Sequence, residues 1–193
     1  MTLAALAGLA APLIYLAAVM AGSWATPGYD QLAMPISALM AGGAGPAWLY
    51  GLLLAYNLTL LGFGLSLPIA RTRLSLVASA VVGIGMLIFP MDAIGAPMRA
   101  TGMVHLMLAG VASLTSLVAI AGGMRHFSRR RERRRAWISA LALGFVLVTG
   151  VLTAAGTAAG WPIAGLLERL TIGGFLVWIG WLACQPAPGS MRA

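Results

Sequence analysis

The sequence contains no lysine, one cysteine and few acidic residues. Its 193 residues include four Asp or Glu and two His, and all twelve basic residues are arginines. Only 8% of the residues are charged, whereas a soluble domain has about 25% and needs them to cover its surface. The lone Cys184 excludes an internal disulfide and a cysteine-based metal cluster. These shortages exclude a soluble domain and a disulfide-stabilised one.

Apolar residues are abundant instead, at 61% of the chain with a mean hydropathy of +0.95. A bilayer core about 30 Å thick requires roughly 20 apolar residues per helix. Six apolar runs approach or reach that length, at residues 3–24, 47–69, 74–91, 102–124, 136–159 and 165–184. We therefore predict an all-α bundle of six transmembrane helices that forms a single domain over residues 1–193. The first run is expected to be a retained helix, because no positive segment precedes it as in a signal peptide.

Arginine predicts the orientation of the bundle. Arg71 and Arg73 lie between the second and third runs, and seven further arginines lie in residues 125–135, between the fourth and fifth. The positive-inside rule places both connections, and hence both termini, in the cytoplasm, in agreement with Arg192. We expect the basic run to contact anionic lipid and not nucleic acid. The arginines that make this expected contact are Arg129, Arg130, Arg131, Arg133, Arg134 and Arg135.

With this topology, most other ionisable residues collect at the opposite, outer end of the bundle. They are Asp30, Asp92, Arg99, His105, Glu168 and Arg169. An ionisable group near a membrane segment usually faces the bundle interior and pairs. We predict that Asp92 pairs with Arg169 or Arg99, since Glu168 and its neighbour Arg169 diverge by about 100° on a helix.

The first outer connection, residues 25–46, is long for a link between packed helices. Residues 35–39 read as a short helical or re-entrant segment that begins at Pro35, and the glycines after it end the segment. Such a segment is expected to cap the bundle as a lid. Tyr29 is expected to anchor the connection at the membrane interface.

Four motifs give the chain a family resemblance: ISAL after the Tyr29-Asp30 pair, FPMDAIGAP at 89–97, VHLMLAG at 104–110 and GLLERL at 165–170. Together they resemble the domain-of-unknown-function 998 (DUF998) family of small bacterial and archaeal membrane proteins. The resemblance implies six helices and the bacterial inner membrane, with no established activity. The positions that it singles out are Ser37, Asp92, His105, Glu168 and Arg169. Two departures are Met91, where a Cys is frequent, and the dense basic run.

Several functions remain open for the outer cluster. It could be an ion-pair network that fixes helix register, or a polar site for a lipid-like or small amphiphilic ligand. It could also serve acid and base catalysis within the membrane, as in an isomerase or terpene cyclase, or belong to a subunit of a larger membrane complex. We take the ligand site as the working hypothesis.

No metal or other cofactor is expected. His105 and His126 are 21 residues apart on one helix, which is about 31 Å, so they cannot ligate one haem together.

Overall fold

The computed structural model describes residues 2–185 and consists of six long helices and one short one. Arg192 lies outside the described residues. The elements are α1 (Leu3–Ala25), η1 (Ile36–Gly43), α2 (Ala47–Ser66), α3 (Ala70–Ile88), α4 (Ala100–Arg129), α5 (Arg133–Ala159) and α6 (Ala164–Ala183). Each of the six long helices is long and apolar enough to cross a membrane. The predicted all-α, six-helix architecture is confirmed.

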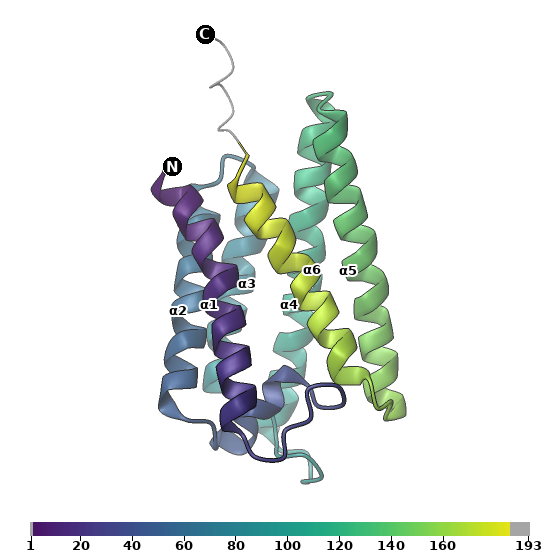
Figure 1. The fold of residues 1–193 in the computed structure, drawn as a ribbon. Helices are drawn as coiled ribbons and strands as arrows, with labels where there is room; N and C mark the ends of the chain where they lie inside the picture. Colours follow the sequence, from purple (N-terminus) through teal and green to yellow (C-terminus); the bar gives the residue numbers. More distant parts are fainter. Residues whose placement is uncertain (1, 186–193) are drawn as a thin grey trace.

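The helices alternate in direction, and consecutive helices pack side by side (Figure 1). α1 also packs against α6, so the six helices form a closed ring. One end of the bundle carries the α2–α3 and α4–α5 connections, the start of α1 and the end of α6. We call it the arginine end, and we call the opposite end, which carries η1, the η1 end. The side of a membrane that each end faces stays a prediction.

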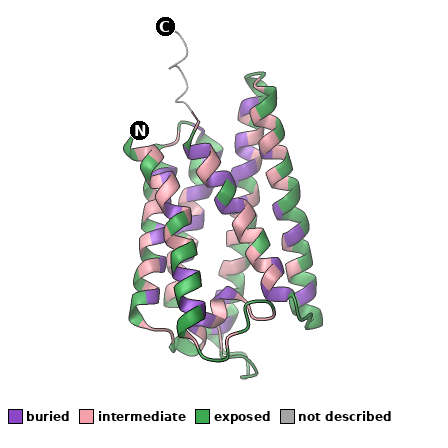
Figure 2. Cartoon of the chain, in the orientation of Figure 1, coloured by how far each residue is buried: buried purple, intermediate pink, exposed green. Residues whose placement is uncertain are grey.

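The outer surface of the bundle is apolar. Figure 2 shows exposed residues along the full length of the helices, and many are large apolar side chains such as Leu13, Leu114 and Leu141. In water, a protein with such a surface would aggregate. In a membrane, the same surface contacts lipid tails, which are equally apolar. The exposed apolar surface is what a multi-pass membrane protein requires.

The interior combines large apolar side chains with a few polar contacts between helices. Trp178 is buried in α6 and donates from Nε1 to Ser139 Oγ in α5 at 3.2 Å. Thr72 in α3 donates to the backbone carbonyl of Ala119 in α4 at 3.0 Å. Hydrogen bonds of this kind hold helices together where burial of apolar surface in lipid provides no driving force.

Helix ends differ most from the prediction where arginine or proline determines them. Most of the basic run is helical, because α4 continues to Arg129 and α5 begins at Arg133, which leaves residues 130–132 as the turn between them. Arginine is a good helix former, so these two helices extend beyond the apolar runs. α3 ends at Ile88, three residues earlier than predicted, because Phe89 precedes a proline and leaves the helical conformation.

The lid segment is confirmed as a helical piece. η1 follows Pro35 as a 3₁₀ helix and is interrupted at Ala41 and Gly42, where Gly42 has a φ of 63°. It packs into the bundle through Ile36, Leu39 and Met40, which are buried. η1 therefore covers the end of the bundle instead of projecting from it (Figure 1).

Candidate functional site

The predicted pair between Asp92 and Arg169 does not form. Oδ2 of Asp92 accepts the backbone N–H of Arg99 at 2.8 Å, and the Arg169 guanidinium binds other groups. Arg99 precedes the first residue of α4, so the Asp92 carboxylate lies at the positive end of that helix, where a negative charge is stabilised. The predicted charge partner is thus a helix N-terminus, and Arg99 contributes its backbone instead of its side chain.

Arg169 binds the loop between α1 and η1. Its Nη2 donates to the Tyr29 hydroxyl at 2.5 Å, and its Nη1 donates to the Met34 carbonyl at 3.1 Å and to Gly165 in its own helix at 2.8 Å. The guanidinium also lies over the Tyr29 ring, 5.5 Å from the ring centroid. These contacts hold residues 29–36, which we call the strap, against the second turn of α6.

Glu168 binds the same segment from its other end. Its Oε2 accepts the backbone N–H of Ile36 at 2.6 Å, and the carbonyl of Leu32 in the strap accepts the N–H of Leu166 at 2.9 Å. Glu168 and Arg169 thus contact different residues of the strap. We use the name α6 clamp for four residues and the contacts described above: Tyr29, Ile36, Glu168 and Arg169.

Tyr29, expected from the sequence only to anchor the connection at the membrane interface, also binds Arg169. Its hydroxyl donates to the Pro35 carbonyl at 3.0 Å and accepts from Arg169. Burial raises the pKa of this phenol above its ordinary value, against the opposite effect of Arg169. The hydroxyl therefore stays protonated at neutral pH and can donate and accept at once. Its position beside Asp30 in the Tyr-Asp motif was the available signal.

Asp30 and Ser37 have local roles. Oδ1 of Asp30 accepts the backbone N–H of Leu32 at 2.8 Å, an Asx turn that starts the strap, and the Asp30 side chain is exposed. Ser37 Oγ donates to Met91 Sδ at 3.0 Å, and the N–H of Gly42 donates to the Met91 carbonyl at 2.7 Å. η1 is thereby attached to the α3–α4 connection.

His105 is buried near the start of α4, with 4% of its surface exposed. Its Nδ1 lies 2.8 Å from the carbonyl oxygen of Phe89, which follows the last residue of α3. Because a carbonyl only accepts, Nδ1 carries the hydrogen. His105 thus satisfies a carbonyl at the end of α3, a group that helices leave without an internal partner.

We expect His105→Leu to lower the free energy of unfolding by about 1–3 kcal/mol, because it leaves this carbonyl without its donor. His105→Asn, which can present an amide N–H from a similar position, is expected to recover part of the loss. Thermal unfolding of the three proteins in detergent measures the difference. Equal losses in both variants would show that the hydrogen bond is not what His105 contributes.

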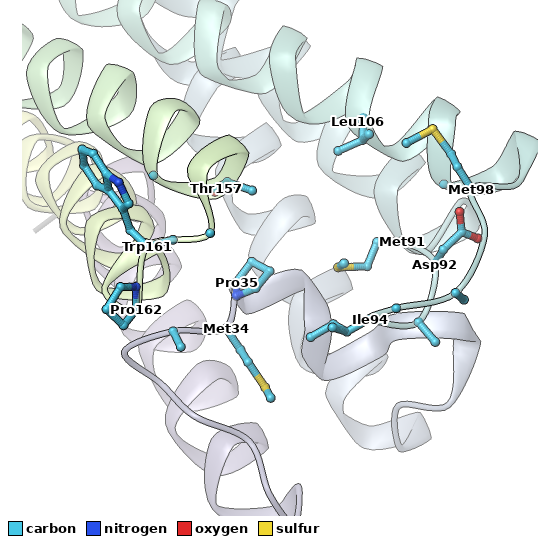
Figure 3. A pocket seen from close by; sticks show the side chains of 18 residues that line it. Met34, Pro35, Met91, Asp92, Ile94, Met98, Leu106, Thr157, Trp161 and Pro162 are labelled. Atoms are coloured by element: carbon cyan, nitrogen blue, oxygen red, sulfur yellow. The ribbon is translucent and has the colours of Figure 1, made fainter.

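A cavity of about 510 Å³ lies at the η1 end between the strap, the α3–α4 connection, α4 and the α5–α6 connection (Figure 3). Apolar side chains dominate its lining. Those that Figure 3 labels are Met34, Pro35, Met91, Ile94, Met98, Leu106, Trp161 and Pro162. Asp92 is the one ionisable side chain among the lining residues, and Thr157 adds a hydroxyl. Its volume lies within the range of about 300–1,000 Å³ that ligand sites occupy.

The predicted site residues thus do not form one cluster. Asp92 lines the cavity, Glu168 and Arg169 fix the strap that forms one wall of it, and His105 caps α3. Asp30, Ser37 and Arg99 do not line the cavity. Asp92, His105 and Glu168 each bind a backbone group, and no hydrogen bond in residues 2–185 joins any two of the three. Acid and base catalysis by these residues therefore gains no geometric support. In residues 2–185, no three His, Cys, Asp or Glu are grouped as metal ligands would be.

Comparison with known proteins identifies one relationship. A family model described as "Protein of unknown function (DUF998)" matches residues 9–185. This range contains the strap, the α6 clamp and every residue that lines the cavity. Comparisons with curated proteins and with solved structures gave no significant match.

Proposed function

The chain belongs to the DUF998 family, a family without an assigned activity, and from the cavity at its η1 end we propose that it binds a lipid-like or small amphiphilic ligand. The observation that supports the proposal is an apolar cavity of about 510 Å³ with one carboxylate in its wall. Apolar walls with a few placed polar groups are typical of sites for small molecules. The protein is then a binding or transport component of the membrane.

The position of the cavity favours an amphiphile over a water-soluble ligand. It lies at one end of the transmembrane helices, where the apolar core of a bilayer gives way to headgroups. Several lining side chains are also exposed on the protein surface, among them Ile94, Met98 and Leu106. A ligand in the cavity therefore keeps its apolar part in contact with protein and lipid, while its polar head reaches Asp92.

Asp92 determines which head groups fit. A carboxylate accepts hydrogen bonds, so it favours a hydroxyl or ammonium head and repels a phosphate or carboxylate. Arg169 would have favoured an anionic head, but it does not line the cavity and its guanidinium holds the strap. We propose a ligand with an apolar tail and a hydrogen-bond-donating head.

Native mass spectrometry of the detergent-purified protein, with extraction and identification of retained small molecules, tests this function. We expect wild type to retain a defined amphiphile. Leu106→Trp, which replaces an aliphatic side chain of the cavity wall with a larger indole ring, is expected to lose it. Asp92→Asn is expected to reduce retention about tenfold or more, the effect of one hydrogen bond to a charged group.

Leu114→Trp is the matched control, because Leu114 lies on the same helix, is 63% exposed and does not line the cavity. It is expected to retain the ligand like wild type. Equal retention by all four proteins would contradict the cavity as the binding site. A retained ligand whose only polar group is anionic would contradict the role given to Asp92.

A further inference from the structure

The α4–α5 hairpin extends past the rest of the bundle at the arginine end (Figure 1). Gly122 of α4 lies against Arg71 and Thr72, in the first turn of α3. From Gly122, α4 continues for seven residues to Arg129, which is about 10 Å at the helical rise of 1.5 Å per residue. The two helices therefore carry their basic tip beyond the point where α3 begins.

The tip carries a concentrated positive charge. Residues 125–135 contain seven arginines and one acid, Glu132. Arg135 pairs with Glu132 at 2.7 Å and lies over the Phe127 ring, 5.8 Å from its centroid. The exposed arginines that remain are Arg125, Arg129, Arg130, Arg131, Arg133 and Arg134.

Arg131 occupies a position that favours glycine. Its φ is 59°, and it is the one non-glycine residue with positive φ that is found in residues 2–185. Its N–H donates to the Ser128 carbonyl at 3.0 Å, and the N–H of Glu132 donates to the Phe127 carbonyl at 3.0 Å. These two bonds form a Schellman motif, in which glycine normally occupies the left-handed position. An arginine here strains the backbone in a way that glycine would avoid, which indicates a use for its side chain apart from folding.

We propose that this tip, residues 125–135, is a binding surface for the headgroups of anionic phospholipids. The headgroup region adds roughly 5–8 Å to each side of the hydrocarbon core, so an extension of about 10 Å crosses it. Because α4 and α5 continue directly from their membrane spans, the fold itself brings the arginines to the level of lipid phosphates. Guanidinium groups match phosphate oxygens with paired hydrogen bonds. The positive charge begins at Arg125, close to the level at which α3 begins. A water-soluble acidic partner would not require charge so near the membrane-spanning part of the helices.

The test is a titration of the full chain in detergent with phosphatidylglycerol or phosphatidylcholine of identical acyl chains, followed by native mass spectrometry. Wild type is expected to bind phosphatidylglycerol more tightly than phosphatidylcholine. A triple variant, Arg129→Gln, Arg130→Gln and Arg131→Gln, is expected to lose at least tenfold in affinity for phosphatidylglycerol and to bind phosphatidylcholine unchanged. Arg99→Gln removes one exposed charge at the η1 end and is expected to leave both affinities as in wild type.

Arg131→Gly separates the roles of side chain and backbone. Glycine relieves the strain, so the melting temperature is expected to rise, while the affinity for phosphatidylglycerol falls about fivefold, the effect of one arginine near a membrane surface. The proposal is overturned if wild type binds the two lipids equally, or if the triple variant keeps its preference. It is also overturned if Arg131→Gly lowers the melting temperature and leaves lipid affinity unchanged, because Arg131 would then serve the fold.

Discussion

Arg169→Met is expected to lower the free energy of unfolding by about 3 kcal/mol and to abolish ligand retention. Methionine has a similar length but cannot donate to the Tyr29 hydroxyl or to the Met34 carbonyl. Hydrogen bonds to a charged group contribute about 1.5–3 kcal/mol each, and part of this is recovered when the strap moves into water. For a chain of this size the loss corresponds to a decrease in melting temperature of about 6–12 °C, measured by thermal unfolding in detergent.

The expected loss of ligand follows from the position of the strap. Its residues Ala33, Met34 and Pro35 line the cavity, so releasing the strap removes a wall. Arg99→Met is the control, because Arg99 is an exposed arginine at the same end of the bundle. Its effect on stability is expected within about 0.5 kcal/mol. If the two variants behave alike, the α6 clamp does not hold the strap.

The number of helices and their approximate bounds could be predicted from the sequence because the thickness of the bilayer sets them. A span of about 20 apolar residues is a requirement set by membrane thickness, and the six runs of the sequence meet it with errors only at their ends. Those errors have two causes, because arginines extend α4 and α5 beyond the apolar runs and prolines follow the ends of α2 and α3. Hydropathy marks where a helix leaves the membrane, whereas its actual end depends on local breakers such as Pro68 after α2 and Pro90 after α3.

The partners within the site could not be predicted in the same way. Asp92 and Arg169 were expected to meet because both carry charge at the same depth. Depth does not fix position around the ring of helices, and backbone groups also compete for charged side chains. Asp92 binds the N–H of Arg99, seven residues further along its own connection, and Arg169 binds carbonyls of the strap. The expectation that Glu168 and Arg169 do not pair with each other is confirmed, since no ion pair joins them in residues 2–185.

Gly165→Ala is expected to displace the strap without removing any charge. A Cβ at position 165 would overlap the carbonyl oxygen of Met34 and would lie 2.9 Å from the Met34 carbonyl carbon. These are backbone atoms, and the α6 clamp holds them in place, so they cannot move aside as a flexible side chain would. We expect a loss of about 1–3 kcal/mol in the free energy of unfolding, typical of overpacking at a close contact, together with loss of the cavity ligand.

Gly173→Ala is the control on the same helix, and the opposite effect on stability is expected for it. A Cβ at position 173 meets nothing within 4 Å, and alanine favours a helix over glycine by about 0.5–1 kcal/mol. This variant is therefore expected to be slightly more stable than wild type and to retain the ligand. Thermal unfolding and native mass spectrometry of the two variants distinguish two roles for the strap. If Gly165→Ala loses stability but keeps the ligand, the strap only closes the bundle, and the binding site must be built by the α3–α4 and α5–α6 connections alone.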